Sequence, residues 1–265
     1  MNAGEKLILY FRAAIALRSP NVTGFPLLPK RLRRGSPHSR NAFNGFLLWT
    51  RRLQLPAAAV ILDVGANHGD FAQAANVLFP EAKVFLFEPL PDMQRHLQSL
   101  IASGRTNWRL MPCALGSEPG RFPLVVDDTD DSIGSFAGFS EDYLQANPGA
   151  RPTREITCEV RTLDEVAASE KIENIDLLKV DVEGFEFEVL KGAVSTLSKT
   201  QAIIVEVSLI RRARDAGHPL IGMLELLTSA GFHVVEVFPS LFDPATPWKP
   251  TEFNLLLRRS GRTGS

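Results

Sequence analysis

The chain is poor in cysteine, with only Cys113 and Cys158 among its 265 residues. Two thiols cannot form a disulfide framework, so we expect a reducing, cytoplasmic location. The sequence also lacks an apolar run that could cross a bilayer, because the hydrophobic stretch at residues 7–17 is short and contains Arg12. No small-residue cleavage site follows this stretch, which argues against a secretory signal peptide.

A large excess of charge is missing as well. The formal net charge of −1 argues against bulk binding to nucleic acid. The distribution is uneven, however, because residues 1–52 hold ten lysines and arginines and a single acid, Glu5. We therefore predict a basic N-terminal arm at residues 1–50 that precedes one domain at residues 51–265. The arm would pack on the body or on a second subunit of a homo-oligomer, or bind anionic lipid or a phosphorylated substrate.

Two hallmarks of nicotinamide-dependent sugar oxidoreductases and epimerases are absent. The glycine turn at residues 65–69 has the spacing GxxxG instead of the dinucleotide fingerprint GxGxxG. Neither tyrosine, Tyr10 or Tyr143, is followed by lysine four residues later. Such an oxidoreductase remains the weaker alternative for the function.

What is present from about residue 60 onward is an alternation of strand and helix patterns. Apolar strands that alternate with helices predict an α/β fold, with a mostly parallel sheet covered on both faces. Two added strands are expected within residues 117–162, and the last two strands lack a helix between them. We predict strands at 60–64, 83–87, 108–112, 175–181, 202–207, 233–238 and 253–258, and helices at 69–79, 91–103, 163–170, 184–199 and 219–230.

The segment 60–71, VILDVGANHGDF, is the most informative motif. An apolar strand ends at Asp63, and a tight turn of small residues leads into a helix. A carboxylate before this turn would repel a pyrophosphate but suits a ligand with an ammonium group. Glu88 ends the next strand, where an acid can accept both hydroxyls of a ribose. A nucleoside joined to an amino acid fits both acids, and S-adenosylmethionine is such a molecule.

A second group of polar residues follows later strands. Asp181 ends the strand LLKVD at the edge predicted for Asp63 and Glu88, with Lys179 and Glu183 on the same strand parity. Glu206 ends the neighbouring strand. Methyl transfer needs an aligned nucleophile and a proton acceptor, so these four residues are the catalytic candidates. A structural pair between Lys179 and Glu183, and a structural role for Glu206, remain open.

A metal ion is the other possibility at this position. Asp181 and Glu206 on adjacent strand ends would suit Mg²⁺, which lowers the pKa of a bound hydroxyl. Two carboxylates are a thin ligand set, so the sequence favours a site without metal.

Six motifs occur in order: DVGANHGDF, FEPLP, CALGSEPGRF, VRTLDEV, IDLLKVDVEGFEFEVLKGA and IIVEVS. In these motifs residues 58–208 resemble the FkbM-type methyltransferase family. The resemblance implies a Rossmann-like class I methyltransferase fold with a seven-stranded sheet, S-adenosylmethionine as cofactor, and methylation of a hydroxyl on a sugar or other natural product. Methylation of the amine of an amino sugar is an alternative.

The resemblance also implies a cofactor site. Its methionine end would lie along Asp63, Gly65, Ala66, Asn67 and Gly69. Glu88, next to Pro89, would hold the ribose, and Cys113 and Ala114 would lie beside the adenine. The identity of the small-molecule acceptor is left open, and residues 127–150, residues 208–220 and the N-terminal arm are expected to select it.

Overall fold

The computed structural model describes Leu53 and residues 55–104, 107–127, 134–136, 138–146, 149, 152–209, 220–243 and 246–260. The predicted basic arm at residues 1–50 lies outside the described residues, and so does its boundary with the domain. Most of the segment 208–220 and part of 127–150 also lie outside them. Among the described residues, no helix combines the length and the apolar character that a membrane span requires.

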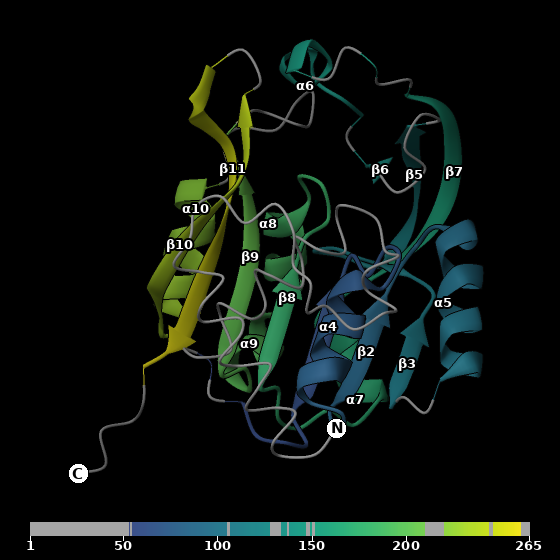
Figure 1. Cartoon of the computed structure of the whole chain (residues 1–265), viewed down its shortest axis with the longest axis vertical. Coiled ribbons are helices and arrows are strands. Elements are labelled where there is room, and N and C mark those ends of the chain that lie inside the picture. Colours follow the sequence, from purple (N-terminus) through teal and green to yellow (C-terminus); the bar gives the residue numbers. More distant parts are fainter. Residues whose placement is uncertain are drawn as a thin grey trace, which may run out of the picture.

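A seven-stranded sheet in the order β10-β11-β9-β8-β1-β2-β3 forms the centre of the described chain (Figure 1). Its first five strands along the chain run parallel to one another. The last strand, β11, is antiparallel to both β9 and β10. The predicted parallel sheet with an antiparallel ending is confirmed. The strands are β1 (Val60–Val64), β2 (Lys83–Phe87), β3 (Trp108–Met111), β8 (Leu177–Val180), β9 (Ala202–Ser208), β10 (Phe232–Asp243) and β11 (Thr246–Arg259).

Helices cover both faces of this sheet, as the apolar strands require. Ile61 of β1 packs into the cluster on one face and Leu62 into the cluster on the other. This alternation follows from the two-residue period of a strand, and it gives every central strand two buried faces. Helices α4 (Asp70–Leu78) and α5 (Pro91–Ser103) cover the first face; α7 (Leu163–Ser169), α8 (Glu186–Lys191), α9 (Val194–Ser198) and α10 (Leu220–Ser229) cover the second.

A second sheet, in the order β4-β7-β5-β6, lies beyond the carboxyl ends of the first (Figure 1). The two added strands predicted within residues 117–162 correspond to β5 and β7. The two-residue strands β4 and β6 and the short helix α6 were not predicted. These elements are β4 (Ala114–Leu115), β5 (Gly120–Asp127), β6 (Gly134–Ser135), α6 (Glu141–Ala146) and β7 (Pro152–Arg161).

The predicted single helix at 184–199 is wrong, because the chain forms two short helices, α8 and α9, with a break at Gly192 and Ala193. A side chain at Gly192 would lie 2.0 Å from the carbonyl oxygen of Gly116. The carboxylate of Asp164 accepts hydrogen bonds from the N–H groups of Ser195 and Thr196, at 2.9 and 2.7 Å. A long-range backbone contact and a cap supplied by α7 therefore divide the helix.

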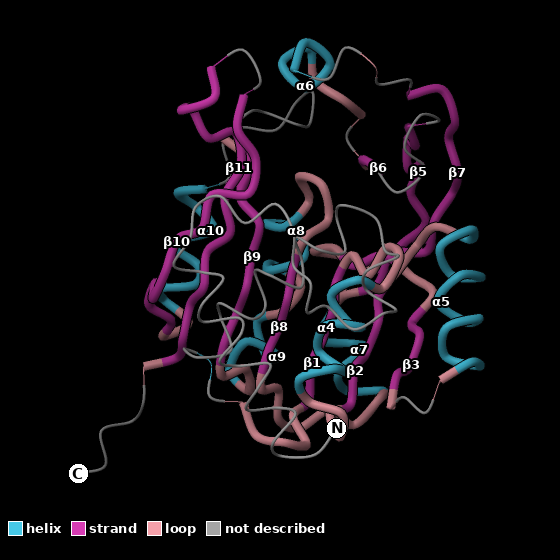
Figure 2. Tube along the Cα trace, in the orientation of Figure 1, coloured by secondary structure: helices cyan, strands magenta, loops and turns pink. Residues whose placement is uncertain are grey.

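Strands β8, β10 and β11 differ in length from the prediction. Strand β8 stops at Val180, so Asp181 belongs to the loop that follows it. Strands β10 and β11 are longer than predicted and form an extended antiparallel pair (Figure 2). Their register shifts at several points, which is typical of bulged strands that twist strongly.

Candidate active site

Asp63 of β1 and Lys179 of β8 are directly opposite in the parallel register, although 116 residues separate them along the chain. The Lys179 ammonium lies 3.2 Å from Asp63 Oδ1, and Asp63 is 0% exposed. Burial raises the pKa of Asp63, and the charge of Lys179 opposes that rise. Asp63 therefore acts as a buried counter-ion of Lys179, and its contact with a ligand stays a prediction.

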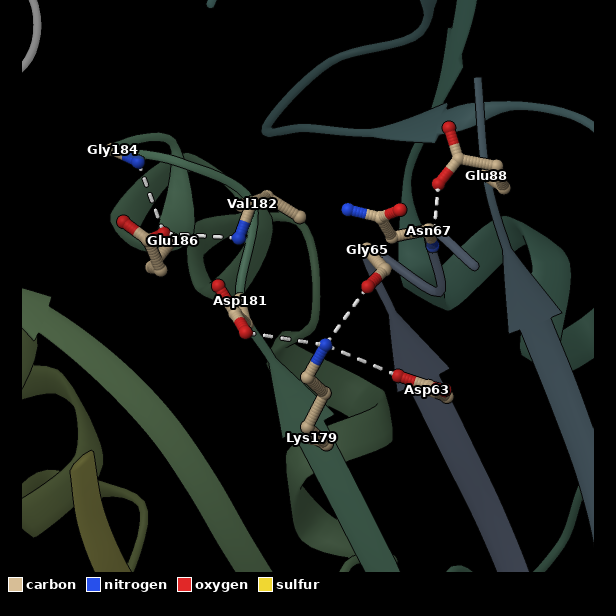
Figure 3. A network of polar contacts seen from close by, with 9 residues as sticks. All are labelled: Asp63, Gly65, Asn67, Glu88, Lys179, Asp181, Val182, Gly184 and Glu186. Atoms are coloured by element: carbon tan, nitrogen blue, oxygen red, sulfur yellow. Dashed lines mark hydrogen bonds and ion pairs between the residues drawn. The ribbon is translucent and has the colours of Figure 1, made fainter. Parts of the chain in front are cut away.

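Lys179 connects the two central strands of the sheet at their carboxyl ends (Figure 3). Its ammonium donates to the carbonyl oxygen of Gly65 at 2.8 Å and lies 3.4 Å from Asp181 Oδ2. Burial alone would lower the pKa of Lys179, but the charges of Asp181 and Asp63 raise it above its ordinary value. Lys179 stays charged and is no proton acceptor. Its ion pairs within the described chain are with Asp63 and Asp181, not with Glu183.

The glycine turn after β1 uses its own amide groups for internal hydrogen bonds. The N–H groups of Gly65 and Ala66 both donate to the carbonyl oxygen of Phe87, and that of Gly69 donates to Ala66. The N–H of Asn67 donates to Glu88 Oε2 at 2.8 Å. A phosphate-binding turn needs free N–H groups, so this turn does not resemble a pyrophosphate site.

Gly65 allows two backbone segments to meet. A side chain there would lie 1.8 Å from the carbonyl oxygen of Asp181, and the φ angle of +77° also favours glycine. The N–H of Asp181 in turn donates to the carbonyl oxygen of Val64 at 3.1 Å. The first turn and the loop after β8 are therefore packed backbone against backbone, which fixes Asp181 beside the predicted cofactor turn.

Glu88 is held at the end of β2 by two amide groups. Its Oε2 accepts from Asn67 and its Oε1 from the N–H of Leu90, both at 2.8 Å. The side chain is 4% exposed, and burial raises its pKa to about 7. The carboxylate is thus pre-oriented beside the turn (Figure 3), where the sequence placed the ribose of the cofactor.

The residues predicted beside the adenine lie next to Glu88. The N–H groups of Glu88 and Cys113 both donate to the carbonyl oxygen of Met111, at 3.2 and 2.9 Å. Cys113 and Ala114 are buried, whereas Pro89 is half-buried. Burial raises the pKa of the Cys113 thiol to about 11, so this cysteine is no nucleophile at neutral pH. The structure brings these residues together, and their contact with a cofactor stays a prediction.

Three half-buried carboxylates meet at the ends of β8 and β9. One oxygen each of Asp181, Glu183 and Glu206 lies within 4.8 Å of the others. Burial and the charges of Asp181 and Glu186 raise the pKa of Glu206 well above its ordinary value. Three carboxylates at this spacing could also hold a divalent cation. Three of the four catalytic candidates, Asp181, Glu183 and Glu206, therefore lie close together. The fourth, Lys179, forms an ion pair with Asp181.

The route by which Glu183 reaches this group differs from the prediction. The sequence placed Lys179, Asp181 and Glu183 on one face by strand alternation, but the strand ends at Val180. Glu183 has a φ of +60° and Gly184 a φ of +98°. A left-handed turn, not strand alternation, therefore positions the Glu183 carboxylate.

No role was predicted for Glu186, although it lies in the motif IDLLKVDVEGFEFEVLKGA. Glu186 is 6% exposed, and its Oε1 accepts hydrogen bonds from the N–H groups of Val182 and Gly184, both at 3.0 Å (Figure 3). An acid at the first position of a helix is the available signal, since such residues often bond nearby N–H groups.

A family profile and several known proteins match this chain. The profile of the methyltransferase FkbM domain matches residues 63–234. The 2-O-methyltransferase NoeI of Sinorhizobium fredii is 32% identical over 186 residues, covering 68% of this chain and 74% of NoeI. The 31-O-demethyl-FK506 methyltransferase FkbM of Streptomyces tacrolimicus is 29% identical over 210 residues, covering 72% of this chain and 78% of that enzyme. The hexuronic acid methyltransferase AglP of Haloferax volcanii is 31% identical over 150 residues, covering 56% of this chain and 55% of AglP.

Among solved structures, a chain of a fibrillarin/Nop5p complex matches with a TM-score of 0.50 and 14% identity, covering 84% of this chain and 82% of that one. At this identity the match concerns the fold alone, and it agrees with the predicted Rossmann-like class I architecture. The family profile covers well over half of the chain. The chain therefore belongs to the methyltransferase FkbM family, and its predicted class, an S-adenosylmethionine-dependent methyltransferase, is confirmed.

Proposed function

We propose that this protein transfers a methyl group from S-adenosylmethionine to a hydroxyl of a small molecule, a sugar or a glycosylated natural product. The observation that carries the proposal is the half-exposed carboxylate of Asp181, fixed by Lys179 beside the first turn. The names of the relatives support the acceptor class, because NoeI is a 2-O-methyltransferase and AglP a hexuronic acid methyltransferase.

The charge of this sheet edge suits a cationic cofactor. Six acids lie at the strand ends, in the loops that follow them or at the first position of α8, and Lys179 is the cation placed among them by ion pairs in the described structure. S-adenosylmethionine carries a sulfonium and an ammonium group, whereas its demethylated product has lost the sulfonium charge. The ionised carboxylates among them favour the charged cofactor over its uncharged-sulfur product. The six acids are Asp63, Glu88, Asp181, Glu183, Glu186 and Glu206.

The cofactor is proposed to lie across the ends of β1, β2 and β3, as ligands of open α/β sheets do. Its amino acid end would follow the turn at residues 65–69, and its ribose would meet Glu88, which retains acceptor capacity beyond its two amide contacts. Cys113 and Ala114 would border the adenine. The occupied amides of the turn fit this ligand better than a dinucleotide, since no pyrophosphate needs them.

The cofactor supplies a methyl group already activated by the sulfonium. The remaining task for the protein is to align the acceptor oxygen with the carbon–sulfur bond and to remove its proton. Asp181 accepts a hydrogen bond from the hydroxyl and takes the proton as the oxygen–carbon bond forms and the carbon–sulfur bond breaks. Lys179 holds the Asp181 carboxylate in place, and Glu183 and Glu206 orient the acceptor.

Methylation of an amine is the second candidate, because three carboxylates would also attract an amino sugar. A protonated amine has no free electron pair, so this reaction requires Asp181 or Glu206 to remove a proton first. Fragment masses of the methylated product show whether the labelled methyl group is on oxygen or on nitrogen, which separates an ether from an amine.

The proposal is tested with purified protein, deuterium-labelled S-adenosylmethionine, and a panel of sugars and glycosylated natural products. We expect transfer of a labelled methyl group to a hydroxyl of at least one acceptor, seen by mass spectrometry. The Asp181→Asn variant is the control and should form product at least about 100-fold more slowly. Transfer at the same rate by this variant would contradict the proposed role of the carboxylate.

A further inference from the structure

The loop between β8 and α8, residues 181–185, has an unusual backbone. Glu183 has a φ of +60° and Gly184 a φ of +98°. A left-handed conformation costs about 1 kcal/mol or more for a residue with a side chain, so the surrounding structure must maintain it. The same loop carries Asp181 and Glu183, two of the three carboxylates that meet at the ends of β8 and β9.

Glu186 makes the contacts that hold this loop. Its Oε1 atom accepts hydrogen bonds from the N–H of Val182 and the N–H of Gly184, both at 3.0 Å. These two amides flank Glu183, so one carboxylate oxygen fixes the backbone on both sides of the strained residue (Figure 3). Two N–H groups pointing at one oxygen also define the direction of the peptide planes between them.

The burial of Glu186 makes its two hydrogen bonds to the loop difficult to replace. Glu186 is 6% exposed, so water cannot easily replace its oxygen if the side chain is changed. Burial raises the pKa of Glu186 to about 7, and the N–H groups of Gly184 and Val182 oppose the rise. The carboxyl is therefore partly protonated near neutral pH. An acceptor oxygen, more than a negative charge, is what the loop requires.

We propose that Glu186 is a positioning residue for methyl transfer, which holds the loop 181–185 in the conformation that aims Asp181 and Glu183 at the acceptor. This inference rests on the proposed function, because it concerns the same carboxylates. Glu186 does not touch the reacting atoms. It acts through the two backbone amides, and the resulting loop brings the Asp181 carboxylate to the edge that Glu206 also faces.

The test compares two substitutions of nearly equal size. Glu186→Gln keeps an oxygen that can accept both hydrogen bonds, whereas Glu186→Met fills the same space and cannot accept them. We expect kcat to fall about 10- to 100-fold in the methionine variant, the loss typical of a misplaced reacting group. The dissociation constant of S-adenosylmethionine should stay within threefold, and the glutamine variant should keep kcat within about threefold of the wild type.

Glu188 provides the matched control on the same helix. It bonds the hydroxyl of Ser117 at 2.7 Å and pairs with Lys191 at 2.6 Å, away from the loop 181–185. Glu188→Gln and Glu188→Met should both leave kcat within about twofold. Melting temperatures of all variants, measured in parallel, verify that each assay uses folded protein.

A kcat of Glu186→Met equal to that of wild type, in folded protein, would overturn the inference. A lower melting temperature without a lower kcat would assign Glu186 a purely structural role and overturn it too. If Glu186→Met does not fold, Gly184→Ala replaces it, because an alanine at φ +98° strains the same loop and leaves Glu186 intact; an unchanged kcat there contradicts the inference. Failure of the proposed function looks different, since wild type would then be inactive or Asp181→Asn fully active.

Discussion

The acids at the carboxyl edge of the central sheet fall into two halves that differ in burial and in bonding partners. At the ends of β1 and β2, Asp63 and Glu88 are almost completely buried and held by an ammonium or by backbone amides. At the ends of β8 and β9 the carboxylates are half-buried, and the Asp181 side chain is 34% exposed. In the first half, ion pairs and hydrogen bonds fix both carboxylates. In the second half, the Asp181 carboxylate is partly exposed, and we propose that it meets the acceptor.

Lys179 joins these two halves. It is a neighbour of Asp63 on one side and of Asp181 on the other, and it also holds the carbonyl oxygen of Gly65. One buried cation therefore connects the turn proposed to bind the cofactor with the carboxylate proposed to accept the proton. In the proposed mechanism, exposure and partners, not residue type, separate the acids that bind the cofactor from those that act on the acceptor.

The largest expected effect comes from Asp181, in the half-buried group at the ends of β8 and β9. Asp181→Asn removes the proposed proton acceptor but keeps the shape of the side chain, so kcat should fall by about 10²- to 10⁴-fold. The dissociation constant of S-adenosylmethionine should change by less than about tenfold, or 1.4 kcal/mol. Steady-state kinetics and calorimetry measure both quantities. A near-normal kcat would remove Asp181 from the mechanism.

The next effect concerns the link between the halves. Lys179→Met leaves the buried Asp63 without its counter-ion, which should lower the free energy of unfolding by about 3 kcal/mol in urea titrations. Lys191→Met, which breaks a more exposed pair with Glu188, should cost less than about 1 kcal/mol. Adding Asp63→Asn to Lys179→Met should restore part of the loss. Equal effects of the two lysine substitutions would contradict the linking role.

The buried carboxyl of Glu88, at the end of β2, predicts a pH dependence of cofactor binding. Burial raises the pKa of Glu88 to about 7, and ribose hydroxyls donate more strongly to the ionised carboxylate. Binding therefore releases a proton below this pKa, so affinity should rise up to about tenfold per pH unit below pH 7 and level off above it. Glu88→Gln should flatten the profile in calorimetric titrations from pH 5.5 to 8.5. A slope that survives in this variant would assign the titration to another group.

The smallest effect is expected from metal removal. Asp181, Glu183 and Glu206 could hold a divalent cation, yet the buried ammonium of Lys179 already lies beside Asp181 and lowers the need for one. Activity after dialysis against EDTA should stay within about twofold of the untreated enzyme. Loss of activity that Mg²⁺ restores would move the three carboxylates from proton transfer to metal binding.

Much of the fold was accessible from the sequence because its signals are local. The strands at 60–64 and 83–87 and the helix at 91–103 match the structure, since an apolar run with turn residues at its ends defines each strand and Pro91 starts the helix. The break at Gly192 depends on the backbone of Gly116, which is distant in the chain. No local pattern reveals such a contact.

The site was accessible in part for the same reason. Parallel strands place Asp63, Glu88 and Asp181 at one edge, and the sequence predicted this. The partner of Lys179 depends on the register between β1 and β8, which sets Asp63 opposite it. The proposed role of Glu186 depends on the left-handed conformation of Glu183. The sequence does not signal this conformation, because the residue at position 183 is not a glycine. Both features arise from three-dimensional neighbours that spacing along the chain does not encode.

A crystal structure with S-adenosylhomocysteine bound tests the central claim most directly. We expect the ribose hydroxyls within hydrogen-bond distance of Glu88, the amino acid end beside the turn at residues 65–69, and the sulfur facing Asp181. A nucleoside bound elsewhere on the chain, or a sheet edge that stays empty at saturating ligand, would contradict the account.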